Sequence, residues 1–114
     1  MDFLRTSGGL RSGSTRGSAM RVTVLVPGVL RQHAGGAREV ELDLPAAGAT
    51  LAAALDVVAA RHPALERRLR DERGALRRYV NLFVDGEECR RLAGADTTLR
   101  DGAEIQVIPS IAGG

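Results

Sequence analysis

Four stretches of the chain alternate apolar and polar residues with a period of two, and this pattern constrains the fold more than any other feature of the sequence. They are RVTVLV (21–26), REVELDLP (38–45), RYVNLFV (78–84) and AEIQVIP (103–109). Because successive side chains of a strand point to opposite faces, each stretch predicts a strand with one buried face. The residues predicted to point inward are Val22, Val24, Val26, Val40, Leu42, Leu44, Val80, Leu82, Val84, Ile105 and Val107.

A helical period replaces this alternation between the second and third predicted strands. Thr50 is a favourable N-cap residue for a helix that starts directly after it. Four apolar residues then recur at the spacing of one buried helix face, namely Leu51, Leu55, Val58 and Ala59. Pro63 either ends this helix or begins a second, short one. Leu65 and Leu69 extend that second piece to about Arg70.

Turn signals complete the order of the predicted elements. Asp85-Gly86 predicts a hairpin turn, after which the segment from Glu87 to Arg90 pairs back as a short strand. Asp101-Gly102 predicts a turn before the last strand. The order is strand, strand, helix, strand, strand, strand, and one main helix must cover one face of a mixed sheet. The predicted fold class is α+β, with the ubiquitin-like β-grasp order.

The composition changes near residue 20. Residues 1–19 are rich in Gly, Ser, Thr and Arg and have no apolar period, so we expect a disordered leader or an expression scar there. Residues 20–114 form the predicted β-grasp domain with a flexible Gly-Gly tail. All sixteen basic residues are arginine. Residues 20–114 contain thirteen arginines and thirteen acidic residues, so their formal net charge is zero. This neutral balance argues against a nucleic-acid partner.

Several other classes of protein are disfavoured by the residues present. A single cysteine, Cys89, excludes a disulfide framework and an iron–sulfur cluster within the chain. Its thiol is interpreted as structural or incidental, with a nucleophile as the alternative. His33 and His62 lack metal-ligand spacing, so no metal site is predicted. No apolar run approaches the length of a membrane span, and a cytoplasmic location without a membrane partner is expected.

The end of the chain, VIPSIAGG, raises a functional hypothesis. Pro109 cannot donate to a strand ladder, so the sheet is predicted to end near Ile108 and residues 110–114 to project as a flexible arm. The reactive group of that arm is the α-carboxylate of Gly114, which ATP could convert to an acyl-adenylate. Gly113 and Gly114 form a thin arm that can enter an enzyme channel. The alternative is a passive tail.

Three apolar residues are predicted to point away from the helix, namely Leu25, Phe83 and Ile108. If they are contiguous, they form a partner-binding patch on the outer face of the sheet. If they are scattered, they need no explanation, because single exposed apolar residues are common.

VIPSIAGG on this pattern resembles the end of the ThiS/MoaD family of ubiquitin-like sulfur carriers. The stretches RVTVLVPGVLRQHAGG, RRYVNLFVDGEECR and DGAEIQVIPSIAGG look most like the CysO-type carriers of cysteine biosynthesis. The resemblance implies that an E1-like enzyme adenylates Gly114 and that sulfur then replaces AMP to give a thiocarboxylate. It also implies a PLP-dependent cysteine synthase as acceptor and a metal-dependent peptidase that regenerates Gly113-Gly114.

By this resemblance the chain is not an enzyme but a sulfur-donating co-substrate. It holds no cofactor of its own, since ATP and PLP belong to the partner enzymes. The residues expected at partner interfaces are Leu25, Phe83, Ile108, Pro109, Ser110, Ile111 and Ala112.

Other functions remain open at this stage. The same tail could serve the small subunit of molybdopterin synthase, or the domain could be a β-grasp interaction module that transfers nothing. Conjugation to amines of other proteins is a third possibility, and the absence of lysine excludes chains built on its own side chains. The arginine-rich segment 61–78 is interpreted as a solvated face, with docking to an acidic partner surface as the functional alternative. Few aromatic residues are available to stack nucleic-acid bases.

Overall fold

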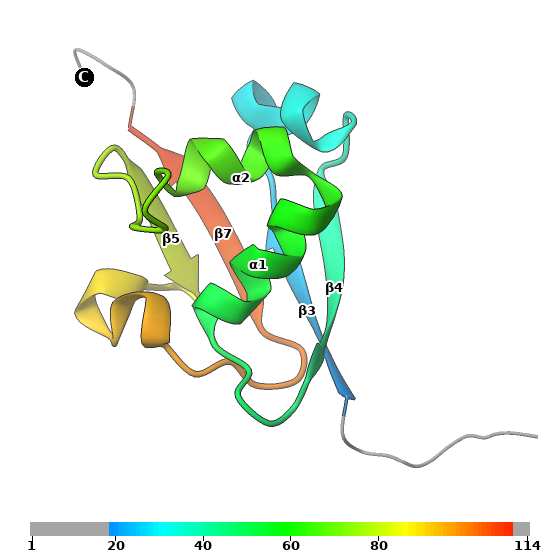
Figure 1. Cartoon of the computed structure of the whole chain (residues 1–114), viewed down its shortest axis with the longest axis vertical. Coiled ribbons are helices and arrows are strands. Elements are labelled where there is room, and N and C mark those ends of the chain that lie inside the picture. Colours follow the sequence, from blue (N-terminus) through cyan, green and yellow to red (C-terminus); the bar gives the residue numbers. More distant parts are fainter. Residues whose placement is uncertain (1–18, 111–114) are drawn as a thin grey trace, which may run out of the picture.

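The computed structural model describes residues 19–110, which fold into one mixed sheet covered on one face by two consecutive helices (Figure 1). The strands are β3 (Ala19–Leu25), β4 (Glu39–Pro45), β5 (Val80–Val84), β6 (Glu87–Glu88) and β7 (Glu104–Pro109). The helices are α1 (Leu51–Arg61) and α2 (Pro63–Leu69), with short 3₁₀ helices η1 (Gly28–Ala34), η2 (Cys89–Arg91) and η3 (Gly94–Asp96). The predicted β-grasp fold is confirmed.

The sheet order β4-β3-β7-β5-β6 places the first and last strands side by side at its centre. β3 pairs with β4 as an antiparallel hairpin and with β7 in parallel, and β5 pairs antiparallel with both β7 and β6. A parallel pair requires a long crossover connection, which here contains both helices. The core therefore lies between the sheet and the layer formed by α1 and α2.

The inward faces predicted from the alternation are confirmed. All eleven residues predicted to point inward are buried, with at most 6% of their surface exposed. Burial of an aliphatic side chain of this size contributes about 1.5–3 kcal/mol, so the packing of the sheet against the helices is the main source of stability.

The first helix begins as predicted but buries a slightly different stripe. The hydroxyl of Thr50 accepts a hydrogen bond from the backbone N–H of Ala53 at 3.2 Å and so caps α1. The buried residues of α1 are Leu51, Ala54, Leu55 and Val58. The prediction of Ala59 on this stripe was wrong, because the i, i+3, i+4, i+7 spacing from Leu51 selects Ala54 and leaves Ala59 half-buried at its flank. Pro63 begins α2.

The hairpin after β5 forms as predicted, but its return strand is shorter. Asp85 and Gly86 both have positive φ, 51° and 89°, as a two-residue hairpin turn requires. Strand β6 ends at Glu88, and the prediction that it continues to Arg90 was wrong. The Glu88 carboxylate accepts a hydrogen bond from the backbone N–H of Arg90 at 3.2 Å, which turns the chain into the 3₁₀ helix η2.

We expect Leu55→Ala to lower the free energy of unfolding by about 2–5 kcal/mol, because Leu55 is fully buried and its truncation leaves a cavity. The matched control is Leu92→Ala, at a leucine that is 43% exposed, where the loss should stay below about 1 kcal/mol. Urea unfolding followed by circular dichroism measures both. Equal losses would mean that Leu55 does not lie in the core.

Candidate functional site

The candidate site is the edge of the sheet at which β7 ends. Because β3 and β7 are parallel, their carboxyl ends meet at the same edge, and η1 follows β3 there (Figure 1). β5 runs the opposite way, so the residue before it, Tyr79, lies at this edge too. Ser110, which follows β7 directly, therefore lies at this edge beside Tyr79.

The last described residues are held more firmly than predicted. Pro109 remains in the ladder opposite Val80, and the backbone N–H of Ser110 donates a hydrogen bond to the carbonyl oxygen of Tyr79 at 2.6 Å. The strand ends at Pro109, which confirms the predicted end of the sheet near Ile108, but the prediction that the projecting arm begins at Ser110 was wrong, because Ser110 is still bonded to the sheet. Successive backbone N–H groups of a strand point to opposite sides. The backbone nitrogen of Pro109, which has no hydrogen to donate, points away from β5 and towards the β3 side. On that side the pairing of β7 with β3 has already ended at Gln106, so no hydrogen bond is lost.

The other predicted tail residues, Ile111, Ala112, Gly113 and Gly114, lie outside the described residues. A chain of four residues can span at most about 14 Å. A group that binds the α-carboxylate of Gly114 must therefore come close to Ser110 and to the surface around it.

A pair of arginines fixes the backbone to which Ser110 is bonded. Arg90 donates hydrogen bonds to the carbonyl oxygens of Arg77 and Val80, at 2.8 and 3.1 Å. Arg77 donates from Nε to the carbonyl oxygen of Arg67 at 2.8 Å, and its guanidinium lies 6.0 Å from the centre of the Tyr79 ring, within cation–π range. Sequence analysis missed Tyr79. If the antiparallel pairing of β5 with β7 had been known, it would have placed Tyr79 opposite the residue that follows β7. The sequence does not specify which strands are neighbours.

The three apolar residues predicted on the outer face do point away from the helices. Leu25 and Phe83 are half-buried, and Ile108 is 39% exposed. Leu25 and Phe83 both pair with Gln106, from opposite sides, so this glutamine separates them. Ile108 is two residues further along β7 and is the diagonal neighbour of Phe83, which an aromatic side chain can reach. By the same register Ile108 is also the diagonal neighbour of Leu25, so Ile108 lies next to Gln106 along β7, between the strands that carry Leu25 and Phe83.

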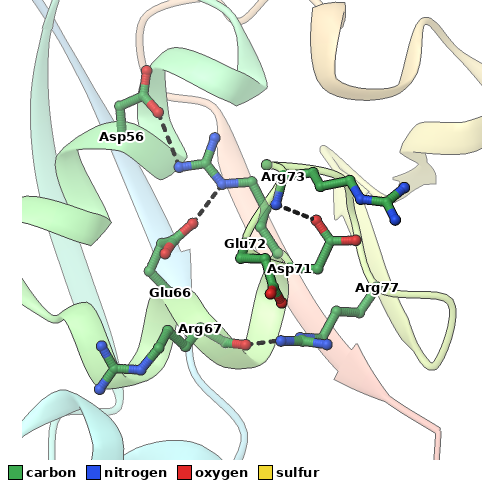
Figure 2. A pocket seen from close by; sticks show the side chains of 9 residues that line it. Asp56, Glu66, Arg67, Asp71, Glu72, Arg73 and Arg77 are labelled. Carbon is green, nitrogen blue, oxygen red and sulfur yellow. Dashed lines mark hydrogen bonds and ion pairs between the residues drawn. The ribbon is translucent and has the colours of Figure 1, made fainter.

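A charged hollow of about 470 Å³ lies beside α2 and the loop that follows it (Figure 2). Arg70 lines the hollow and bridges two carboxylates, with contacts of 2.9 Å to Asp56 and 2.6 Å to Glu66. Asp71 accepts hydrogen bonds from the backbone N–H groups of Ala75 and Arg73, which lower the pKa of its carboxyl group below the ordinary value. These carboxylates already have partners within the fold, so we interpret the hollow as structural.

Cys89 is fully buried, which agrees with its interpretation as a structural thiol. Burial raises the pKa of the Cys89 thiol above the ordinary value, and the neighbouring Glu88 carboxylate adds to the rise. A raised pKa lowers the thiolate fraction near neutral pH, which is the opposite of what an active nucleophile needs. Within residues 19–110 no three or more His, Cys, Asp or Glu side chains are grouped to bind a metal ion. In the same range, no helix has the length and apolar character needed to cross a membrane.

Comparison with known proteins gives consistent matches over almost the whole domain. The sequence profile of the ThiS family matches residues 24–114. The sulfur carrier protein CysO of Mycobacterium tuberculosis is 37% identical over 97 residues, which cover 83% of this chain and all of that protein.

Solved structures agree with this match. A chain in the crystal structure of the Amycolatopsis orientalis BexX/CysO complex has a TM-score of 0.69 at 36% identity, covering 82% of this chain and 99% of that chain. The crystal structure of Mycobacterium tuberculosis CysO has a TM-score of 0.67 at 35% identity, covering 79% of this chain and 99% of that one.

We expect Cys89 in the folded protein to be alkylated by iodoacetamide at pH 8 at least about tenfold more slowly than in urea, because burial and the raised pKa both limit attack by the thiolate. Mass spectrometry over time measures the rate. The control is Leu92→Cys, which adds a thiol at an exposed position and should give one fast and one slow site. Fast reaction of both thiols would show that Cys89 is accessible.

Proposed function

The chain belongs to the ThiS family, and on this premise we propose that it is a sulfur carrier whose C-terminal Gly113-Gly114 is adenylated and converted to a thiocarboxylate. The observation that carries the proposal is the family match, which extends through Gly114 and therefore includes the tail. The relative CysO is named a sulfur carrier protein, and it is matched over its whole length.

The geometry of the described residues suits this role. β7 ends at an edge of the sheet, and Ser110 is bonded to Tyr79 rather than folded back over the helices. The folded domain would hold the base of the tail while a partner enzyme takes its end. Two glycines at that end have no side chains that could obstruct a narrow channel.

The proposed chemistry needs two steps at the carboxyl carbon of Gly114. In the first, a carboxylate oxygen attacks the α-phosphorus of ATP, and pyrophosphate leaves to give an acyl-adenylate. In the second, a sulfur nucleophile attacks the acyl carbon, and AMP leaves with the oxygen that was bonded to phosphorus. When the nucleophile is hydrosulfide, loss of its proton leaves a thiocarboxylate at the end of the tail with no change of oxidation state, and the sulfur of this group is a better nucleophile than the oxygen it replaces.

The chain supplies the acyl group, and we assign the catalysis to its partners. An E1-like adenylating enzyme would provide the ATP site and the sulfur transfer. The carrier is then a co-substrate rather than an enzyme and has no cofactor of its own. Because ATP is the activating reagent, we place this reaction in the cytoplasm.

For the acceptor we propose a PLP-dependent cysteine synthase, in which the thiocarboxylate sulfur adds to an aminoacrylate derived from an activated serine. The product is a thioester, and an S-to-N acyl shift would move the Gly114 acyl group to the cysteine amine. A metal-dependent peptidase would then hydrolyse this amide bond with water, which releases cysteine and restores Gly113-Gly114. The CysO relatives, which are 35–37% identical, favour this acceptor over a pterin precursor of molybdopterin. For the contact with partner enzymes we propose the outer-face residues Leu25, Phe83 and Ile108 together with residues 109–112.

We expect the full chain to gain the mass difference between sulfur and oxygen when it is incubated with ATP, a sulfide source and the adenylating enzyme of the same cell. The gain should be absent when Gly114 is deleted, because the acyl group then lies one residue short of its place in the channel. Intact-mass spectrometry measures both proteins.

A control for folding accompanies this experiment, since the deletion should leave the urea midpoint unchanged. If the enzyme is competent on another carrier and neither protein gains mass, the sulfur-carrier proposal is wrong and a non-transferring interaction module becomes the better reading. Mass gain followed by transfer to a pterin precursor, and not to the aminoacrylate, would retain the carrier and replace the acceptor.

We expect the double variant Phe83→Ala/Ile108→Ala to raise the KM for the carrier in thiocarboxylate formation by about tenfold with little change in kcat, because these side chains contact the partner and not the reacting carbon. Thr23→Ala, on the same face but towards the opposite edge, is the control. Steady-state kinetics at several carrier concentrations measure the effect. An unchanged KM in a double variant that remains folded would exclude this pair from the interface.

A further inference from the structure

A second hollow of about 470 Å³ lies next to the charged hollow of Figure 2 and differs from it in charge. We call it the tail-base pocket, and it is lined by His33, Ala64, Arg67, Arg68, Arg77 and Tyr79. The two hollows share Arg67 and Arg77. Ion pairs of Arg70 join residues that line the charged hollow, and no ion pair joins the described residues that line the tail-base pocket.

The difference lies in the carboxylates. Four arginines and four carboxylates line the hollow of Figure 2, and Arg70 is bound there by two of the carboxylates. Three arginines and a histidine line the tail-base pocket, which has no acidic residue in its lining. Among residues 19–110 no carboxylate lies within 4.0 Å of the guanidinium of Arg67, Arg68 or Arg77. The pocket is thus a concentration of positive charge within a domain whose arginines and acidic residues balance overall.

Part of the pocket is preorganised. Arg77 is fixed by its hydrogen bond to the carbonyl oxygen of Arg67 and by the ring of Tyr79, which is 53% exposed. One Nε–H of Arg77 is used in that bond, and its terminal nitrogens make no hydrogen bond to the described residues. A guanidinium that is already held in place loses little entropy when it binds a carboxylate through two nitrogens.

The pocket also lies at the base of the tail. Tyr79, which forms one wall, accepts the hydrogen bond from the backbone N–H of Ser110. The four residues after Ser110 can reach at most about 14 Å. An enzyme that binds the end of the tail must therefore approach the surface that contains this pocket.

We propose that the tail-base pocket docks a carboxylate-bearing surface of the enzyme that binds the tail, with Arg67, Arg68 and Arg77 as the contacting groups. This proposal rests on the proposed function, because it assumes that a partner takes the end of the tail. The pocket orients the partner beside Ser110 and increases the rate of encounter through its charge. Phe83 and Ile108 give an apolar contact on the outer face, and the pocket adds a polar contact at the edge.

A protein carboxylate fits the pocket better than a nucleic acid. A nucleic-acid site contacts several phosphates along a basic stripe and stacks bases on aromatic rings. The tail-base pocket is compact, and Tyr79 is its one aromatic lining residue, already in contact with Arg77. The three arginines of the pocket are enough to complement the charge of a few aspartate or glutamate side chains.

The first test titrates the ¹⁵N-labelled full chain with hexaglutamate and follows the arginine Nε–Hε signals by NMR. We expect saturable shifts at Arg67, Arg68 and Arg77 and at the backbone amide of Tyr79. The shifts at Arg77 and Tyr79 should be lost in Arg67→Gln/Arg68→Gln, and all four should be retained in the matched control Arg91→Gln/Arg100→Gln, which removes the same charge elsewhere. Equal shifts at Arg91 and Arg100 would show non-specific attraction and overturn the proposal.

Three further arms test other occupants of the pocket. Inorganic phosphate that gives the same saturable shifts at the same concentration would make the pocket a small-anion site. An oligonucleotide that displaces hexaglutamate would make it a nucleic-acid site. If deletion of residues 111–114 shifts the arginine signals without any added ligand, the tail of the same chain occupies the pocket. Each of these results would replace the docking proposal.

The second test uses the adenylating enzyme of the same cell and the intact-mass assay. We expect Arg67→Gln/Arg68→Gln to lower kcat/KM by about tenfold at low salt, with a smaller difference as the salt concentration rises. The control Arg91→Gln/Arg100→Gln should behave as wild type. If the wild-type chain gains sulfur and the pocket variant is equally active, docking is wrong and the carrier function stands. If the wild-type chain gains none, the carrier function fails, and the NMR titration still reports on the pocket.

Discussion

The parallel pairing of β3 with β7 is the interaction on which the rest of the structure depends. Thr23, Val24 and Leu25 pair with Glu104, Ile105 and Gln106, so the two ends of the domain lie together at the centre of the sheet. A parallel pair cannot be closed by a tight turn, and the connection between the hairpin β3–β4 and the rest of the sheet carries both helices across one face. The core is then the space between that connection and the sheet.

The same pairing decides which edge of the sheet carries the functional residues. Two parallel strands end at the same edge, so β7 ends at the edge where η1 follows β3 and where antiparallel β5 starts. Ser110 is bonded there to Tyr79, and Tyr79 lies against Arg77. The strand pairing, together with the packing of α2 and η1, brings the base of the tail, the tail-base pocket and Ile108 to one region, although they come from separate parts of the chain.

Local chemistry allowed most of the elements to be predicted. The alternation in 38–45 identified Val40, Leu42 and Leu44 as buried, and Asp85-Gly86 marked a turn that only residues tolerant of positive φ adopt readily. Predictions were wrong where a tertiary contact outweighed a local pattern. The segment after Glu88 leaves the strand because Glu88 bonds to the backbone of Arg90, and the guanidinium of Arg90 is itself bonded to the carbonyl oxygens of Arg77, before β5, and of Val80, the first residue of β5.

The sequence by itself determined the order of the elements, the inward face of each strand and the C-terminal diglycine, because periodicity and turn chemistry are properties of neighbouring residues. It also supplied the family resemblance. Only the tertiary structure decided that Leu25 and Phe83 flank Gln106 with Ile108 diagonal to both, and that Arg67, Arg68 and Arg77 share a pocket without carboxylates. Those facts depend on which strands are neighbours and on how α2 packs, and such long-range choices are made by the burial of the whole core rather than by any local stretch of sequence.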